Sequence, residues 1–170
     1  CKQAIQVANL PAETINNVSA YLGLAGANVE SAVGALSALL PFKQSRIDSD
    51  ALIALEGAIG NADGAAAIIG TGSVFISRHN TTVQMLGGWG FVVSDLASGA
   101  RLGRACLELS LLAHENIVAP SQLTRKVMER FDNCQQTLVE YAWAASPGDF
   151  GHFAPMVFDY ADMGDENAQT

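Results

Sequence analysis

The stretch "AAAIIGTGSVF", residues 65–75, decides how the chain is interpreted, because a strand-like apolar run ends in Gly70-Thr71-Gly72-Ser73. The glycines allow two interpretations. In a tight hairpin they supply positive φ angles or close packing. In a ligand-binding loop they let backbone N–H groups approach a phosphate.

The spacing of these glycines excludes two common phosphate-binding motifs. No Lys-Ser/Thr pair follows them, so the stretch is not a Walker loop. Phe75 occupies the position of a third glycine and no helix follows, so it is not the dinucleotide fingerprint. On spacing alone, the hairpin is the better interpretation.

The residues before this stretch have the pattern of an α/β layer, in which strands and helices alternate. The expected elements are a helix over 2–18 interrupted at Pro11, a strand over 20–27, and a helix over 28–40 opened by the cap-like Asn28. They are followed by "SRIDSD", residues 45–50, as a short strand or its exit, and by a helix from Asp50 to Gly60.

The residues after it have a different pattern. Three strand-like runs over 64–90, separated by the GTG turn and by "RHNTT", predict an antiparallel meander. Helices are expected over 94–115, 121–130, 134–144 and, after a turn at "SPGD", 150–161. Asp165 is expected to cap one further helical turn. We place a boundary near 61–64, which divides the chain into 1–63 and 64–170.

Composition narrows the class of protein. Apolar residues make up 49% of the 170 residues and charged residues 15%, which is typical of a globular, core-forming chain. The net charge of -8 argues against binding to nucleic acid or to an anionic membrane. No apolar run is long enough for a membrane span, and we expect no signal peptide.

The three cysteines are far apart in sequence, which favours a reducing, cytoplasmic setting without a disulfide framework or metal cluster. His79, His114 and His152 lack the spacing of metal ligands. Both ends of the chain interrupt helix-like patterns, so we expect it to be an internal fragment of a longer protein.

Asp50 is the first candidate for chemistry. A carboxylate at the start of a helix is most often an N-cap, but it is also stabilised by the positive end of the helix dipole. A carboxylate where a strand ends is what a base that activates a hydroxyl requires. The neighbouring Asp48 is interpreted as solvated, and Glu56 as exposed or paired.

The segment "LGGWGFVVSDLASG", residues 86–99, is the second candidate, because three glycines around Trp89 favour neither strand nor helix. Such a segment can let a ligand lie against bare backbone beside an aromatic ring. Trp89 is equally explained as core filler. Asp95 is interpreted as the start of the next helix, either as its N-cap or as a ligand-binding carboxylate.

Four blocks carry a family resemblance: "DSDALIALEGA", "IIGTGS", "GGWGFVVSDLASGARLG" and "SPGDFGHFAPMVFDYADMGD". In this order they resemble the BadF/BadG/BcrA/BcrD-type ATPase family, in particular its N-acetylglucosamine and glucosamine kinases, over residues 21–170. The resemblance implies an α/β, ribonuclease H-like fold of the actin, hexokinase and Hsp70 type. Residues 1–63 would end the first ATPase domain, and 64–170 would form the β-meander and helices of an incomplete second domain.

The resemblance also implies a function. It is ATP-dependent phosphorylation of N-acetylglucosamine or glucosamine at the 6-hydroxyl, with Mg²⁺, by a cytoplasmic homodimer. Asp50 matches the catalytic base, and Thr71, with Gly70 and Gly72, matches the residues at the ATP phosphates. The positions that match the sugar site are Ser73, Val74, Gly88, Trp89, Gly90 and Asp95. No side chain is implied as a metal ligand.

The chain departs from the family pattern in places. The acidic, glycine-rich phosphate loop and the glycine pair near the adenosine are not found, and Leu96 stands where many relatives carry an acid or amide. We therefore expect the chain alone to be inactive. The cysteine spacing does not fit the iron–sulfur activators of the family. Two alternatives stay open: a non-catalytic sugar sensor, which an upstream helix-turn-helix would favour, and a truncated structural domain.

Overall fold

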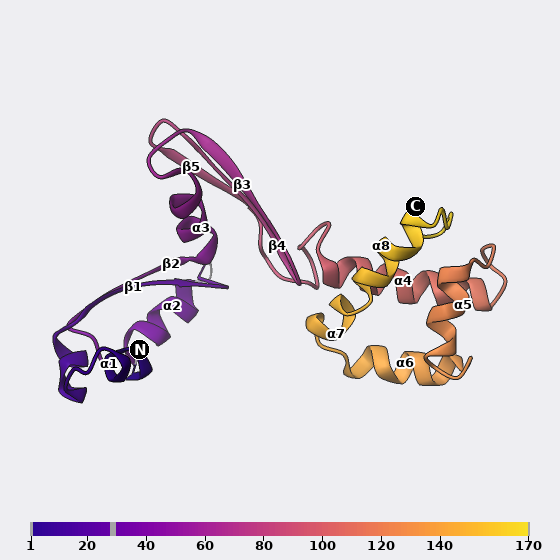
Figure 1. The fold of residues 1–170 in the computed structure, drawn as a ribbon, viewed down its shortest axis with the longest axis horizontal. Coiled ribbons are helices and arrows are strands. Elements are labelled where there is room, and N and C mark those ends of the chain that lie inside the picture. Colours follow the sequence, from indigo (N-terminus) through magenta and orange to yellow (C-terminus); the bar gives the residue numbers. More distant parts are fainter. Residues whose placement is uncertain (1, 28–29, 170) are drawn as a thin grey trace. The chain divides into compact units, whose positions relative to one another are not determined.

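The computed structural model describes residues 2–27 and 30–169, in two compact units (Figure 1). Unit 1 takes its residues from 1–66 and 75–86, and unit 2 from 67–74 and 87–170. Among the described residues, no helix combines the length and the apolar character needed to cross a bilayer.

Unit 1 begins with two short helices in place of one long one. Helix α1 spans Lys2–Val7, and the 3-10 helix η1 spans Ala12–Asn17. Asn9 lies between them with φ 53°, and Pro11 precedes η1 without a backbone N–H to donate. The expected interruption at Pro11 is confirmed.

A parallel strand pair follows. Strands β1 (Ser19–Leu24) and β2 (Gln44–Ser49) pair in parallel, with Ser19 opposite Gln44 and Leu24 opposite Ser49. Helix α2 (Glu30–Ser37) connects them, as a parallel pair requires. The expected cap Asn28 lies outside the described residues. The strand–helix–strand order predicted from sequence is confirmed.

Helix α3 spans Asp50–Ile59, but its N-cap is Ser49. The Ser49 hydroxyl accepts a hydrogen bond from the N–H of Leu52 at 3.1 Å. The N-cap interpretation of Asp50 is therefore wrong, and Asp50 is the first helical residue. Helix α3 packs so closely on β1 that a Cβ at Gly23 would overlap the side chain of Ile53.

A three-stranded sheet has the order β3 (Gly64–Ile69), β4 (Ser73–His79), β5 (Thr82–Gly87). The connections, 70–72 and 80–81, are too short for parallel crossovers, so the strands are antiparallel and the predicted meander is confirmed. Arg78 of β4 forms an ion pair with Glu56 of α3, which decides that Glu56 is paired.

Unit 2 continues as helices α4 (Gly99–His114), α5 (Gln122–Glu129), α6 (Gln135–Ala144), α7 (Pro147–Gly151) and α8 (Ala154–Asp162). Their core includes Leu107, Leu123, Val127, Phe150, Phe153 and Val157. Cys106 belongs to it as well, and burial raises the pKa of its thiol to about 11, so it packs as a small apolar side chain.

Two expectations about these helices need correction, and one is confirmed. "SPGD" is not a turn but the start of α7, where Ser146 and Asp149 form a capping box. The helix expected over 94–115 begins only at Gly99. The Asp165 carboxylate does cap a final turn, since it accepts from the N–H groups of Asn167 and Ala168, and it also accepts from that of Leu123 at the start of α5.

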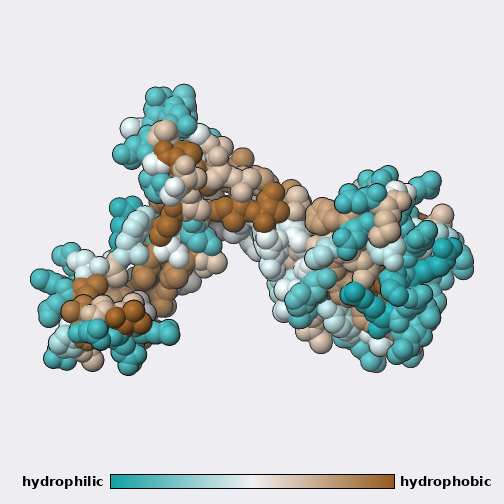
Figure 2. Space-filling view, viewed as in Figure 1, coloured by the Kyte–Doolittle hydropathy of each residue, from teal (hydrophilic) through white to brown (hydrophobic). Residues whose placement is uncertain are grey.

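The helices of unit 2 and the three-stranded sheet differ in the surface that they expose. In Figure 2 the helices of unit 2 present mainly hydrophilic residues, whereas hydrophobic residues are exposed along the strands. Exposed apolar side chains of this part include Ile69, Phe75, Val83 and Leu86.

Candidate functional site

The turn at 70–72 is held against the start of α4. The N–H of Gly99 donates to the carbonyl of Gly70 at 2.7 Å, and the N–H of Ala100 donates to that of Thr71 at 3.2 Å. A Cβ at Gly99 would lie 3.2 Å from the carbonyl oxygen of Gly70, so this contact favours glycine. Two segments about 30 residues apart in sequence, as the residue numbers show, therefore form one local structure.

The N-terminus of α4 has no free donors for a ligand. Ser98, 0% exposed, accepts at its hydroxyl from the N–H of Arg101 at 3.2 Å, and its own N–H donates to the carbonyl of Asp95. Gly99 and Ala100 are already bonded to the turn. Ser98 is therefore the N-cap, and the N-cap interpretation of Asp95 is wrong.

Donors for a ligand remain in the turn itself. Within the described residues, the N–H groups of Thr71 and Gly72 have no hydrogen-bond partner. The side chain of Thr71 is exposed, which leaves its hydroxyl accessible. Two amide donors and one hydroxyl in a short turn form a set that can bind an anion.

A close approach of a side chain, and not the backbone angle, favours glycine at position 72. Neither Gly70 nor Gly72 has a positive φ. A Cβ at Gly72 would lie 2.8 Å from Oδ2 of Asp95, whereas a Cβ at Gly70 would meet nothing within 4 Å. The Asp95 carboxylate thus packs directly on the turn, which links the two segments that the sequence singled out.

The last residue of β5 and the connection from β5 to α4 have an unusual backbone. We call this segment, residues 87–98, the glycine loop. The residues with positive φ in it are Gly87, Gly88, Gly90, Asp95 and Ala97. For Asp95 and Ala97 this conformation costs about 1–2 kcal/mol each. Such strain persists where surrounding contacts impose it, and it is frequent at ligand-binding sites.

The Asp95 side chain lies inside the glycine loop. It is 8% exposed, and its Oδ1 accepts a hydrogen bond from the N–H of Gly90 at 3.2 Å. No cation of the described residues forms an ion pair with it. A carboxylate that is nearly buried with so few partners can accept further hydrogen bonds from a ligand's hydroxyl groups.

Ser73 connects β4 to the glycine loop. Its side chain is 5% exposed, and its hydroxyl donates to the carbonyl of Leu96 at 2.6 Å. The Ser73 carbonyl accepts from the N–H of Gly88, and Val74 packs beneath Gly88, where a Cβ would lie 3.1 Å from Val74 Cγ2. The hydroxyl of Ser73 thus holds the loop in place.

We expect Ser73→Ala to loosen the glycine loop, because the carbonyl of Leu96 loses its donor. The free energy of unfolding of unit 2 should fall by about 1–3 kcal/mol. Hydrogen exchange at the amides of Gly90 and Ser98 should become faster. Ser77→Ala on the same strand is the control and should leave both exchange rates unchanged; equal rates in the Ser73 variant and the parent would refute this role.

The two aromatic residues of the glycine loop behave differently. The Phe91 ring stacks on that of Phe150 in α7, with centroids 5.2 Å apart. Trp89 is 61% exposed, so its interpretation as core filler is wrong. Phe91 holds the loop on the helices, and Trp89 leaves a large aromatic surface for a ligand.

Asp50 belongs to unit 1, where its side chain is exposed at the start of α3. Among the described residues, its Oδ1 accepts only from the N–H of Ala51, at 2.9 Å. Asp48 is different, since it forms an ion pair with Arg46 at 2.7 Å. A hydrogen bond between the side chains of Asp48 and Tyr21 raises the pKa of Tyr21. Asp48 is therefore engaged and not merely solvated, whereas the Asp50 carboxylate remains available for chemistry.

The structure therefore brings together, within unit 2, the predicted residues of the turn and of the glycine loop. The part that sequence reasoning missed is Ser98, although a serine directly before an apolar helical run is a recognisable cap signal. No group of three or more metal-ligating side chains occurs among the described residues.

No protein-family model matches the chain. Among curated proteins, it is 32% identical over 164 residues to the glucosamine kinase GspK of Vibrio cholerae serotype O1, which covers 96% of this chain and 56% of the relative. It is 29% identical over 126 residues to the N-acetyl-D-glucosamine kinase of Dictyostelium discoideum, covering 71% of this chain and 40% of the relative.

Two solved structures also match the chain. A crystal structure of a candidate N-acetylglucosamine kinase from Chromobacterium violaceum matches 99% of this chain and 59% of its own, with a TM-score of 0.87 and 30% identity. A second, from Porphyromonas gingivalis, shares the fold at 22% identity and a TM-score of 0.64. The chain is thus an α/β protein that resembles aminosugar kinases. It spans 56% of the length of the Vibrio cholerae relative and 59% of that of the Chromobacterium violaceum protein.

Proposed function

We propose that this chain is part of an aminosugar kinase, which transfers the γ-phosphoryl group of ATP to the 6-hydroxyl of glucosamine or N-acetylglucosamine. The proposal places it in the BadF/BadG/BcrA/BcrD-type ATPase family, with a ribonuclease H-like fold. Residues 1–63 would end the first ATPase domain and 64–170 would belong to the second. The observation that carries it is the turn with unpaired N–H groups beside a nearly buried carboxylate, in a chain similar to glucosamine kinases.

The phosphate side of the site would be the turn. The N–H groups of Thr71 and Gly72 and the Thr71 hydroxyl would bind phosphate oxygens of ATP, with Gly70 leaving room for them. Because the described residues offer no cluster of metal ligands, Mg²⁺ would be held mainly by the phosphates, as is usual for this ion. It would neutralise the charge that develops on them.

The sugar side would be the glycine loop. The Asp95 carboxylate would accept hydrogen bonds from sugar hydroxyls, and the Trp89 ring would pack on the apolar face of the sugar. Gly88 and Gly90 would expose backbone to it, and Val74 would line it beneath the loop. Ser73 would act by fixing the loop and not by direct contact, since its hydroxyl is bonded to Leu96.

Asp50 would be the general base. Its carboxylate would take the proton of the 6-hydroxyl while that oxygen forms a bond to the γ-phosphorus, and the bond from phosphorus to the leaving oxygen of ADP breaks. Catalysis would otherwise consist of positioning and charge neutralisation. We also propose that the protein is cytoplasmic and acts as a homodimer.

The direct test is a coupled assay of ADP release by the intact protein. ADP release should require an aminosugar, and glucose should be a poorer substrate than glucosamine or N-acetylglucosamine. ADP release that does not depend on any sugar would refute the proposal and favour a sensor or an unrelated ATPase.

A second prediction separates the sugar side from the nucleotide side. In Trp89→Ala and in Asp95→Asn, the KM for the aminosugar should rise by about tenfold or more, as expected for the loss of a hydrogen bond to a charged group or of an aromatic contact. The KM for ATP should change little. Steady-state kinetics with each substrate varied in turn would measure both.

Val93→Ala is the matched control, because Val93 is an exposed residue of the same loop with no assigned role. It should change neither KM. A rise confined to the KM for ATP in the Trp89 or Asp95 variant would show that the two ligands had been assigned to the wrong sides.

A further inference from the structure

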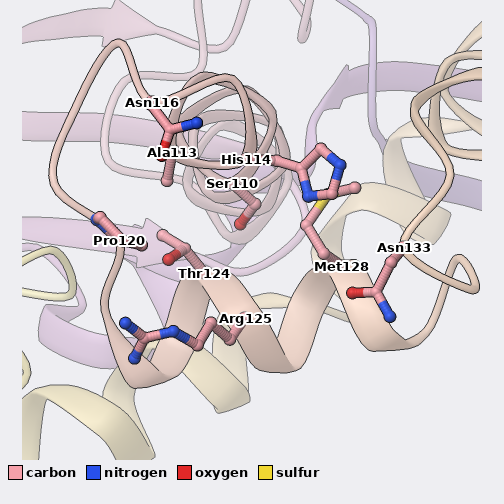
Figure 3. A pocket seen from close by; sticks show the side chains of 9 residues that line it. All are labelled: Ser110, Ala113, His114, Asn116, Pro120, Thr124, Arg125, Met128 and Asn133. Carbon is pink, nitrogen blue, oxygen red and sulfur yellow. The ribbon is translucent and has the colours of Figure 1, made fainter.

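A cavity of about 200 Å³ in unit 2 is lined by residues of α4, of α5 and of the segments that follow these two helices (Figure 3). Its hydroxyl groups are already engaged, since Ser110 donates to the carbonyl of Cys106 at 2.7 Å and Thr124 donates to that of Ser121 at 3.2 Å. None of its lining residues belongs to the turn at 70–72 or to the glycine loop. The feature of unit 2 that the proposed site leaves unexplained lies elsewhere, where the turn and the glycine loop meet.

A negative charge lies against the turn that is proposed to bind phosphate. The Asp95 carboxylate packs on Gly72, where a Cβ would lie 2.8 Å from its Oδ2 and 3.4 Å from its Cγ. Gly72 is also one of the two residues of the turn whose N–H groups have no partner among the described residues. The same residue therefore offers a donor to an anionic ligand and has an anion of the protein beside it.

The charge of this carboxylate is poorly compensated. Its Oδ1 accepts from the N–H of Gly90 at 3.2 Å, and its Oδ2 accepts no hydrogen bond from a described residue. No described cation forms an ion pair with Asp95. Because Asp95 is only 8% exposed, water and salt screen its charge less than they screen a charge on the surface.

The carboxylate and the turn are both held in place. The backbone carbonyl of Asp95 accepts from the N–H of Ser98 at 3.1 Å, and the hydroxyl of Ser73 holds the adjacent Leu96. The turn is bonded in its own right to the N–H of Gly99 at 2.7 Å. A phosphate bound at the turn would therefore stand close to a fixed like charge, and the repulsion would weaken its binding.

We propose that Asp95 makes the binding of ATP depend on the sugar, an inference that rests on the proposed kinase function. In the free protein, the charge of Asp95 weakens the binding of the ATP phosphates to the turn. When hydroxyl groups of the sugar donate to Oδ2, their hydrogen atoms compensate this charge, and the turn binds the phosphates more tightly. The sugar is then favoured as the first ligand, and ATP is seldom bound where no acceptor hydroxyl is present.

The test is calorimetry of the intact protein with Mg²⁺ and the non-hydrolysable β,γ-imido analogue of ATP. It is done with and without a saturating aminosugar, either glucosamine or N-acetylglucosamine, whichever is the better substrate. In the parent, the sugar should raise the affinity for the analogue by about tenfold, within the usual range for coupled sites. Because coupling is reciprocal, the analogue should raise the affinity for the sugar by the same factor.

Asp95→Asn removes the charge and keeps the shape of the side chain. Without sugar, this variant should bind the analogue about tenfold more tightly than the parent does, a gain that a merely structural defect would not produce. Saturating sugar should then add little, so that both proteins bind the analogue alike, in line with the small change expected in the KM for ATP.

Asp95→Ala should show the same gain without sugar, although alanine has no amide that could bind phosphate. Ala97, with φ 61°, shows that the loop accepts alanine in a left-handed conformation. A gain confined to Asp95→Asn would mean that the new amide binds the phosphate, and it would overturn the proposal.

Asp132→Asn is the matched control. Asp132 is an exposed aspartate with φ 54° in the link between α5 and α6, and the charge change is the same. This variant should leave the affinity for the analogue unchanged, and a gain equal to that of Asp95→Asn would mean only a diffuse effect of charge and overturn the proposal.

The parent protein separates this inference from the proposed function. If it phosphorylates the sugar but binds the analogue equally well with and without it, this inference alone is overturned. If it binds no analogue under either condition, the proposed function is overturned as well.

Discussion

Asp50→Asn in the intact protein is expected to lower kcat by about 100-fold or more, the usual scale for the loss of a positioned base. The asparagine keeps the shape of the side chain at the start of α3 but cannot take a proton. Because the carboxylate has one hydrogen bond in the described part of the chain, from the N–H of Ala51, the variant should fold normally. Steady-state kinetics would measure kcat, and circular dichroism would check the fold.

Asp48→Asn is the control for this prediction. It also removes an acid near the end of β2, but one that is engaged with Arg46 and Tyr21. Asp48→Asn should lower the free energy of unfolding and should change kcat far less than Asp50→Asn does. If the Asp50 variant turned over at nearly the normal rate, or if the Asp48 variant lost more activity, Asp50 would not be the base.

Gly103→Ala is expected to have the largest effect on stability. Helix α4 crosses α7 so closely at this point that a Cβ on Gly103 would overlap the carbonyl oxygen of Phe150. A backbone atom cannot rotate away, so the helices must separate. We expect the free energy of unfolding to fall by about 3 kcal/mol. Chemical denaturation followed by circular dichroism would measure it.

Gly103→Ala should also loosen the glycine loop, because the ring of Phe91 in this loop stacks on the ring of Phe150. Gly57→Ala is the contrasting control: Gly57 is inside α3, and a Cβ there would meet nothing within 4 Å. Alanine in the interior of a helix should stabilise the protein by about 0.5–1 kcal/mol. Similar free energies of unfolding for the two variants would contradict the close packing of α4 on α7.

The order of strands and helices followed from local sequence patterns, and the errors lay where two side chains compete for one role. In "DSD" and in "SDLASG" both a serine and an aspartate can cap a helix. In each case the serine is the cap, so neither Asp50 nor Asp95 is needed to cap its helix. The left-handed conformation of Ala97, which has no sequence signal, delays the start of α4.

Features that depend on contacts between distant segments could not be predicted. The hydrogen bond from Ser73 to Leu96 joins residues 23 positions apart, and nothing in either sequence segment indicates it. The packing of Asp95 on Gly72 is of the same kind. Candidate residues could therefore be named from the sequence, but the way in which the turn and the glycine loop support each other could not.

The central claim, phosphorylation of an aminosugar at its 6-hydroxyl, is tested most directly by the product that the intact protein forms. Glucosamine or N-acetylglucosamine would be incubated with ATP and Mg²⁺, and the product examined by mass spectrometry and ³¹P–¹H correlation NMR. The account predicts a monophosphate coupled to the protons at carbon 6, formed in equal amounts with ADP. Phosphate on another hydroxyl, or ADP formed without any sugar phosphate, would contradict it.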